Sequence, residues 1–201
     1  MAHAHSRWRE DDVAMPIVLA LLLVAVFIGE IAAGAAGHER ALVPLGALIT
    51  RGWSYRDWWR VVSFSFLHLN WLHLALNTAG LLWLGRIVER RLGRRRFVTI
   101  FIVSGIASGV AGMLLGPILP TTGVAVGASG AVCGLPAAAA LLSFRRDAED
   151  GRLRLPLVTC LVAVIAISLL PGVSLAGHMG GFIGGAAVAA TTNAARSADP
   201  G

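Results

Sequence analysis

The chain has 201 residues, of which 56% are hydrophobic and 14% are charged, and its formal net charge is +6. A soluble domain is normally about one quarter charged, so this composition excludes an ordinary soluble fold and indicates membrane-spanning segments. The positive charge does not indicate a nucleic-acid partner, because the basic residues are all arginines and gather in short loops between apolar runs.

Six apolar segments follow one another along the chain, each near or above the length of about 17 residues that a helix needs to span a bilayer. They cover residues 14–36, 71–88, 97–115, 128–144, 155–170 and 175–190. They predict an all-α membrane protein, a bundle of six transmembrane helices over residues 14–194 between short cytoplasmic tails, 1–13 and 195–201. We expect the first segment to be a retained span, because no small-residue cleavage site follows it.

Arginines between the segments predict the orientation of the bundle. They lie after the second segment, at positions 90, 91, 94, 95 and 96, and after the fourth, at positions 145, 146, 152 and 154. By the positive-inside rule both loops are cytoplasmic, and six spans then place both termini in the cytoplasm. We therefore expect a multi-pass protein of the plasma membrane, and the lysine-free composition, rich in alanine and glycine, favours a bacterial source.

The connection over residues 37–70, expected on the outer side, is long and combines arginines with aromatic residues. These residues are Arg40, Arg51, Trp53, Tyr55, Arg56, Trp58, Trp59 and Arg60. Such a composition is typical of a segment that lies in the membrane interface, and we expect a large interfacial loop between the first two helices. An ordinary aromatic belt would have the same composition.

Polar side chains inside spans are unfavourable in lipid and are commonly functional. Here they are Glu30, His68, His73, Asn77, Ser129 and His178. At about 1.5 Å of rise per residue, three of them, His73, Ser129 and His178, lie roughly 25 Å from the arginines that follow their segments. They are therefore expected at one depth, and His73 and Asn77, four residues apart, on one helix face.

A serine and a histidine at one depth suit nucleophilic catalysis, because a neutral imidazole can take the proton of a serine hydroxyl. Side chains such as His73 and Asn77, and N–H groups at a helix start, could stabilise the resulting oxyanion. Glycines recur at 127, 130 and 134 and at 177, 181 and 185, a spacing that lets two helices approach closely. The same glycines also fit a plain packing seam with Ser129 as a small spacer, so both interpretations stand at this point.

The ordered set of motifs over residues 50–187 resembles the rhomboid intramembrane serine proteases. GASG at 127–130 resembles the nucleophile motif of that family, and His68, His73 and Asn77 its HxxxxHxxxN pattern. GHMGGFIGG at 177–185 is similar to the family's second-histidine segment. WWR at 58–60 and GRIVERRLGRRRF at 85–97 resemble the Trp-Arg pair of its first loop and the pattern that ends its second span.

The resemblance implies hydrolysis of a peptide bond in or near the transmembrane segment of a membrane-protein substrate. It implies Ser129 as nucleophile and His178 as general base and acid, a dyad, since His178 has no evident carboxylate partner. It implies an oxyanion hole formed by His73, Asn77 and the backbone N–H of Ser129. Supporting roles fall to Arg60, His68, Glu89, Gly127 and Gly130. Two positions depart from the family: Cys133 stands where an aromatic residue often packs on the histidine, and Pro136 is expected to kink the fourth span.

Other classes of protein are less consistent with the sequence. A rhomboid-like membrane chaperone or trafficking factor without activity should lack the serine or the histidine. A transporter or channel would favour internal repeats and buried carboxylates, and only Glu30 lies well inside a span, near its outer end. No aspartate lies in a span, which is inconsistent with an aspartyl protease. The chain has no HExxH motif, no third-ligand pattern among its histidines and no glycine-rich phosphate loop, so we expect no metal and no cofactor. The expected partners are single-pass transmembrane substrates and the lipid bilayer.

Overall fold

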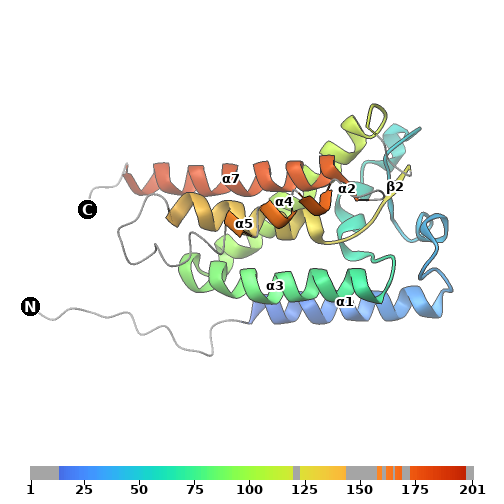
Figure 1. Ribbon diagram of the computed structural model, residues 1–201, viewed down its shortest axis with the longest axis horizontal. Helices are drawn as coiled ribbons and strands as arrows, with labels where there is room; N and C mark the ends of the chain where they lie inside the picture. The colour runs from blue at the N-terminus through green and yellow to red at the C-terminus, as the bar shows by residue number, and fades with distance from the viewer. Residues whose placement is uncertain are drawn as a thin grey trace, which may run out of the picture.

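The computed structural model describes residues 14–119, 123–143 and 173–197, together with helical residues at 158–159, 162–164 and 166–168. Within these ranges, the long helices of the bundle are α1 (Met15–Ala32), α3 (Trp71–Leu92), α4 (Arg94–Leu115), α5 (Ser129–Ser143) and α7 (Leu175–Ser197). α1 and α3 lie side by side along one edge, α7 lies along the other, and α4 and α5 lie between them (Figure 1). α1 and α7 run in opposite directions (Figure 1).

These helices correspond to five of the six predicted apolar segments, with ends that differ by a few residues. Half of the remaining segment, 155–170, lies outside the described residues. Of the helices in the described ranges, α1 and α4 are long and apolar enough to cross a membrane by length and composition, and α5 is apolar but shorter. The count of six spans therefore stays a prediction.

The arginine-rich stretch expected as a loop after the second segment is mostly helical. α3 continues to Leu92 and α4 starts at Arg94, so the connection is the single residue Gly93. Gly93 has a φ of 83°, which favours glycine, and its N–H bonds the carbonyl oxygen of Glu89 at 2.8 Å. The difference arises because arginine is a good helix former, so a basic run can extend a helix beyond the apolar segment.

The packing of α7 uses two rows of glycine. A Cβ on Gly181 or on Gly185 would overlap the backbone of α5 at Gly130 and at Gly134. A Cβ on Gly180 would overlap the backbone of α4, 2.5 Å from the carbonyl oxygen of Ala107. The close helix contact that the glycine spacing predicts is therefore present between α5 and α7, and α7 also packs closely on α4.

Short elements build the first connection at one end of the bundle. They are η2 (Glu39–Leu42), β1 (Leu48–Ile49), η3 (Tyr55–Asp57), α2 (Arg60–Ser63) and η4 (Phe64–Phe66). β1 pairs antiparallel with β2 (Val124–Ala125), which directly precedes α5, in the register Leu48 to Ala125 and Ile49 to Val124. Two-residue strands carry no readable alternation, which is why the sequence did not predict them. This pairing joins the long connection to the chain entering α5.

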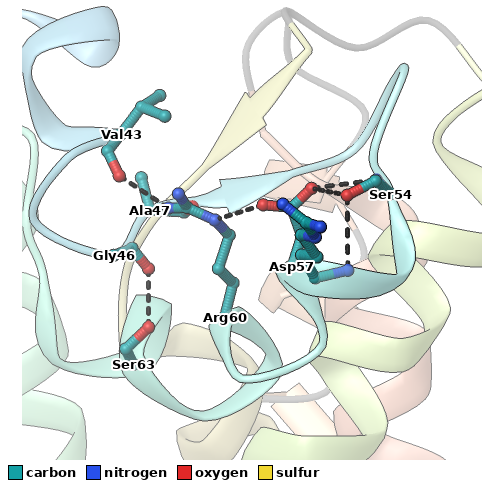
Figure 2. Close-up of polar contacts among 8 residues, drawn as sticks. Val43, Gly46, Ala47, Ser54, Asp57, Arg60 and Ser63 are labelled. Atoms are coloured by element: carbon teal, nitrogen blue, oxygen red, sulfur yellow. Dashed lines mark hydrogen bonds and ion pairs between the residues drawn. The ribbon is translucent and has the colours of Figure 1, made fainter.

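Arg60 anchors the fold of this connection (Figure 2). Its Nη1 donates to the carbonyl oxygens of Val43 and Ala47, at 2.6 and 3.0 Å, and its Nε donates to Asp57 at 2.9 Å. Asp57 also accepts the backbone N–H of Ser54 at 2.8 Å. The Ser54 N–H and the Arg60 guanidinium hold the pKa of Asp57 below its usual value. Arg60 thus joins backbone groups that lie 13 and 17 residues away in the chain.

Aromatic side chains of this connection lie largely on its surface. Tyr55 is 77% exposed and Trp58 is 69% exposed, whereas the indole N–H of Trp53 donates to the carbonyl oxygen of Met113 at 2.9 Å. Exposed rings next to arginines are typical of a segment at the membrane interface. The interfacial position of the connection stays a prediction.

Candidate functional site

Ser129 and His178 meet at the contact between α5 and α7. The Oγ of Ser129 lies 2.8 Å from the Nε2 of His178, although the two residues are 49 positions apart. Ser129 begins α5, and His178 lies in the first turn of α7, which Ser174 caps by accepting the N–H of Gly177 at 3.1 Å. Both side chains are half-buried. The glycine contact between Gly130 and Gly181 brings the two helices close enough for this hydrogen bond.

Gly127 shapes the turn between β2 and α5. Its φ is 119°, and its N–H donates to the carbonyl oxygen of Phe64 at 2.9 Å. A Cβ at this position would lie 2.6 Å from the Nε2 of His73, and 3.8 Å from the Nδ2 of Asn77. Glycine is therefore required here both for its backbone conformation and for the space that the His73 ring occupies.

The first two turns of α3 place His73 and Asn77 beside this turn. Asn70 caps α3 by accepting the N–H of His73 at 2.9 Å, and Asn77 Nδ2 donates to the His73 carbonyl oxygen at 2.9 Å. Both side chains thus face the backbone two residues before Ser129. As the first residue of α5, Ser129 has a backbone N–H without an acceptor within its own helix.

His68 and Glu30 support the position of the His73 ring. The His68 ring is fully buried and packs edge-on against the His73 ring, with centroids 5.2 Å apart. The backbone N–H of His68 donates to both carboxyl oxygens of Glu30, at 3.1 and 3.2 Å. Glu30 is 1% exposed, so it is a packed structural group near the end of α1. Sequence reasoning did not predict this contact, although a carboxylate inside an apolar segment was the signal that could have found it.

Glu89 lies near the opposite end of α3 from His73, and therefore far from the site at Ser129. It is 16 residues after His73, which corresponds to about 24 Å of helix. Its buried carboxyl group accepts the backbone N–H of Met15 at 3.4 Å and lies 3.6 Å from the Nε of Arg94. Glu89 therefore joins the start of α1 to the junction of α3 and α4 and takes no part in the serine–histidine site.

A third polar residue, which sequence reasoning missed, contacts the histidine. Ser168 Oγ lies 2.5 Å from His178 Nδ1 and donates to the Val164 carbonyl oxygen at 2.6 Å. Ser168 is one serine in an apolar stretch, so no local pattern distinguishes it. Its contact with His178 depends on how the helices pack.

A cavity of about 110 Å³ lies next to the His178 ring. It is lined by Cys133, Pro136, Val164, Ser168, Leu175, His178, Met179 and Phe182. Cys133, which stands where the family often has an aromatic residue, lies in the wall of this cavity.

α5 continues through Pro136, so this proline does not end the helix. Within the described ranges, no three His, Cys, Asp or Glu side chains are grouped as a metal site requires.

The fold and the site define an all-helical bundle in which a serine at the start of one helix meets a histidine of another. A family model described as Rhomboid domain matches residues 55–194, well over half of the chain. The chain belongs to the rhomboid family. Rhomboid proteins are multi-pass, all-helical membrane proteins, so this chain is an integral membrane protein.

Curated relatives of the chain carry protease names. Rhomboid-like protease 3 of Toxoplasma gondii is 31% identical over 75% of this chain and 58% of its own length. Rhomboid protease GluP of Bacillus subtilis is 34% identical over 84% of this chain and 32% of its own length. Rhomboid protease AarA of Providencia stuartii is 30% identical over 91% of this chain and 74% of its own length. The chain thus spans between about a third and three quarters of these relatives.

Proposed function

We propose that the protein is an intramembrane serine endopeptidase that hydrolyses a peptide bond in or near the transmembrane segment of membrane-protein substrates. The observation that carries the proposal is the 2.8 Å contact between Ser129 Oγ and His178 Nε2. A hydroxyl in hydrogen-bond contact with an imidazole is the arrangement that activates a serine nucleophile. The protease names of the relatives support the same activity.

In the proposed reaction, His178 Nε2 takes the hydroxyl proton while Ser129 Oγ attacks the carbonyl carbon of the scissile bond. The tetrahedral intermediate collapses, the imidazolium gives its proton to the leaving amine, and an acyl-serine remains. A water molecule, deprotonated by His178, then attacks the acyl carbon, and the imidazolium returns this proton to Ser129 Oγ as the C–O bond to the serine breaks and the new carboxyl end leaves. Two residues therefore perform the proton transfers of both halves of the reaction.

The oxyanion of each tetrahedral intermediate needs donors placed before the reaction starts. We assign these to the N–H of Ser129, the Nδ2 of Asn77 and the ring of His73. Both side chains lie beside the turn at Gly127, two residues before the nucleophile, and this position supports the assignment. Donors on both α3 and α5 would then converge on one side of Ser129.

The proposed substrates are single-pass transmembrane proteins. A helix hides its amide carbonyl groups in its own hydrogen bonds, so the substrate must unwind locally before attack. We further propose that both termini lie in the cytoplasm of a bacterium and that the site opens toward the outer face of the plasma membrane, as the arginine distribution predicts.

Labelling with a serine-reactive fluorophosphonate tests the proposal directly. The purified full chain in detergent is compared with Ser129→Ala and His178→Ala, and each variant is checked for an unchanged unfolding temperature. We expect label on the wild type and none on Ser129→Ala, with a loss of at least about a thousandfold in rate for His178→Ala. Equal labelling of all three proteins, or none on folded wild type, would reject the proposal and favour an inactive rhomboid-like chaperone or trafficking factor.

A further inference from the structure

We propose that Ser168 is a positioning residue of this site, which accepts a hydrogen bond from His178 Nδ1–H and so selects the ring tautomer that can deprotonate Ser129. The inference rests on the proposed function and extends the pair Ser129–His178 by a third residue, which supplies a second hydroxyl group. Ser168 is 4% exposed and lies in the helical residues 166–168, on a different segment from either partner.

The number of protons on the Ser168 hydroxyl decides the direction of its bond to the histidine. A hydroxyl has one proton and two lone pairs. Ser168 Oγ is 2.6 Å from the Val164 carbonyl oxygen, which can only accept, so the hydroxyl proton lies in that bond. If the hydroxyl proton pointed elsewhere, lone pairs of Ser168 Oγ and of the Val164 carbonyl oxygen would face each other at 2.6 Å. Toward His178 Nδ1, at 2.5 Å, Ser168 therefore presents a lone pair, and Nδ1 carries the hydrogen.

The proton on Nδ1 determines what Nε2 can do. A neutral imidazole carries one N–H, so Nε2 has a free lone pair when Nδ1 is protonated. That lone pair faces Ser129 Oγ at 2.8 Å, and the serine donates to it. The opposite tautomer would place N–H against the nucleophile and would leave no base for its proton. When Nε2 takes the proton of Ser129, Nδ1–H stays bonded to Ser168 Oγ and the ring keeps its orientation.

The surroundings of the ring make this bond important. The imidazole borders a cavity of about 110 Å³, whose lining includes Cys133 and Pro136, so part of the space beside the ring is unfilled. A ring next to an unfilled space has fewer contacts that oppose its rotation. The Ser168 hydroxyl is then the contact that holds the imidazole from the Nδ1 side.

The tautomer can be measured without any activity. Full-length protein labelled with ¹⁵N-histidine is studied by long-range ¹H–¹⁵N correlation in detergent, with the His178 signals assigned by their loss in His178→Gln. In wild type we expect a protonated Nδ1 and an unprotonated Nε2, and in Ser168→Ala a mixture of both tautomers. A wild-type ring protonated on Nε2 overturns the inference, whether or not the protein is a protease.

Kinetics supply the second test. Ser168→Ala should lower the fluorophosphonate labelling rate, and the kcat for a transmembrane substrate, about tenfold with little change in KM, the size of effect of one neutral hydrogen bond. Ser168→Thr keeps the hydroxyl and should retain most of the rate. Thr99→Val is the matched control, because Thr99 Oγ1 also donates to a carbonyl oxygen four residues earlier, at 2.9 Å, on an exposed face of α4.

The outcomes separate the two proposals. An active wild type with unchanged Ser168→Ala kinetics rejects the role of Ser168 and leaves the protease intact. A folded wild type that does not label rejects the protease, and the ¹⁵N spectra still decide the tautomer. An equal loss of rate in Ser168→Ala and Ser168→Thr, with lowered unfolding temperatures in both, would show a packing role and overturn the inference.

Discussion

The carboxyl group of Glu30 accepts the backbone N–H of His68 with both of its oxygens, at 3.1 and 3.2 Å. This contact joins the end of α1 to the chain that enters α3. The ring of His68 in turn packs against His73, which the proposed mechanism places in the oxyanion hole. A residue near the end of the first helix thereby supports the position of a side chain beside the turn that precedes Ser129.

Replacing Glu30 should lower the free energy of unfolding, and the loss should be smaller when the new side chain still offers an acceptor to the His68 N–H. Glu30→Ala leaves the buried N–H of His68 without this acceptor, which costs roughly 1–3 kcal/mol. Glu30→Gln keeps a side-chain oxygen and should cost less. The measurement is the thermal unfolding temperature in detergent, with the labelling rate of Ser129 as a second readout. Equal unfolding temperatures for wild type and Glu30→Ala would contradict this role.

Asn77→Ala should slow catalysis without changing the fold. Loss of one oxyanion donor typically lowers kcat by about 10²–10³. We expect such a loss in the cleavage of a transmembrane substrate, with a similar KM because the donor acts mainly on the intermediate. Asn70→Asp is a suitable control on the same helix, since it keeps a side-chain oxygen to cap α3. A normal kcat for Asn77→Ala would remove Asn77 from the oxyanion hole.

Gly181→Ala should separate α7 from α5. The added Cβ would overlap the carbonyl group of Gly130, and overpacking of this kind costs roughly 1–3 kcal/mol. Because Ser129 and His178 lie across the same contact, the labelling rate should fall together with the unfolding temperature. Gly29→Ala makes the same chemical change in α1, where a Cβ meets no atom within 4 Å, and should be neutral or slightly stabilising. The prediction fails if both variants unfold at the same temperature.

Arg60→Lys should weaken the first connection although it keeps the positive charge. A lysine ammonium cannot reproduce the planar fork that reaches Val43, Ala47 and Asp57 together. Each lost bond to a carbonyl oxygen is worth about 1 kcal/mol. Thermal unfolding measures the effect, and Arg56→Lys, at an exposed arginine of the same connection, is the control. Identical behaviour of the two variants would show that the fork is unimportant.

The Arg60 and Asp57 pair also predicts a pH dependence. The pKa of Asp57 is lowered, first by the Ser54 N–H and then by Arg60. The pair therefore stabilises the protein at pH values above the ordinary carboxyl pKa, and this contribution is lost as the pH falls through the lowered pKa. Asp57→Asn should reduce the difference in unfolding temperature between neutral and acidic pH. An unchanged difference would show that Asp57 does not contribute.

The amino-acid sequence alone predicted the course of most helices and singled out Ser129 and His178 as candidates for the site. Apolar runs predicted helices over five segments that the structure has, because a helix in lipid must be apolar along its length. Counting residues at 1.5 Å each placed Ser129 and His178 at one depth, since depth along a straight helix depends only on local geometry. The glycine rows at 130 and 134 and at 181 and 185 predicted the contact that joins them.

Tertiary structure decided the contacts that no local pattern encodes. Ser168, the Glu30 bond to His68 and the pairing of β1 with β2 each join residues of different elements, and single serines or two-residue strands carry no period to read. In our proposal, the nitrogen of His178 that carries the proton is likewise selected by a hydroxyl from another segment, that of Ser168. The sequence thus indicated the serine and the histidine of the candidate site, and the packing of the helices decided which further groups contact them, because those contacts are set by distance in space and not by distance along the chain.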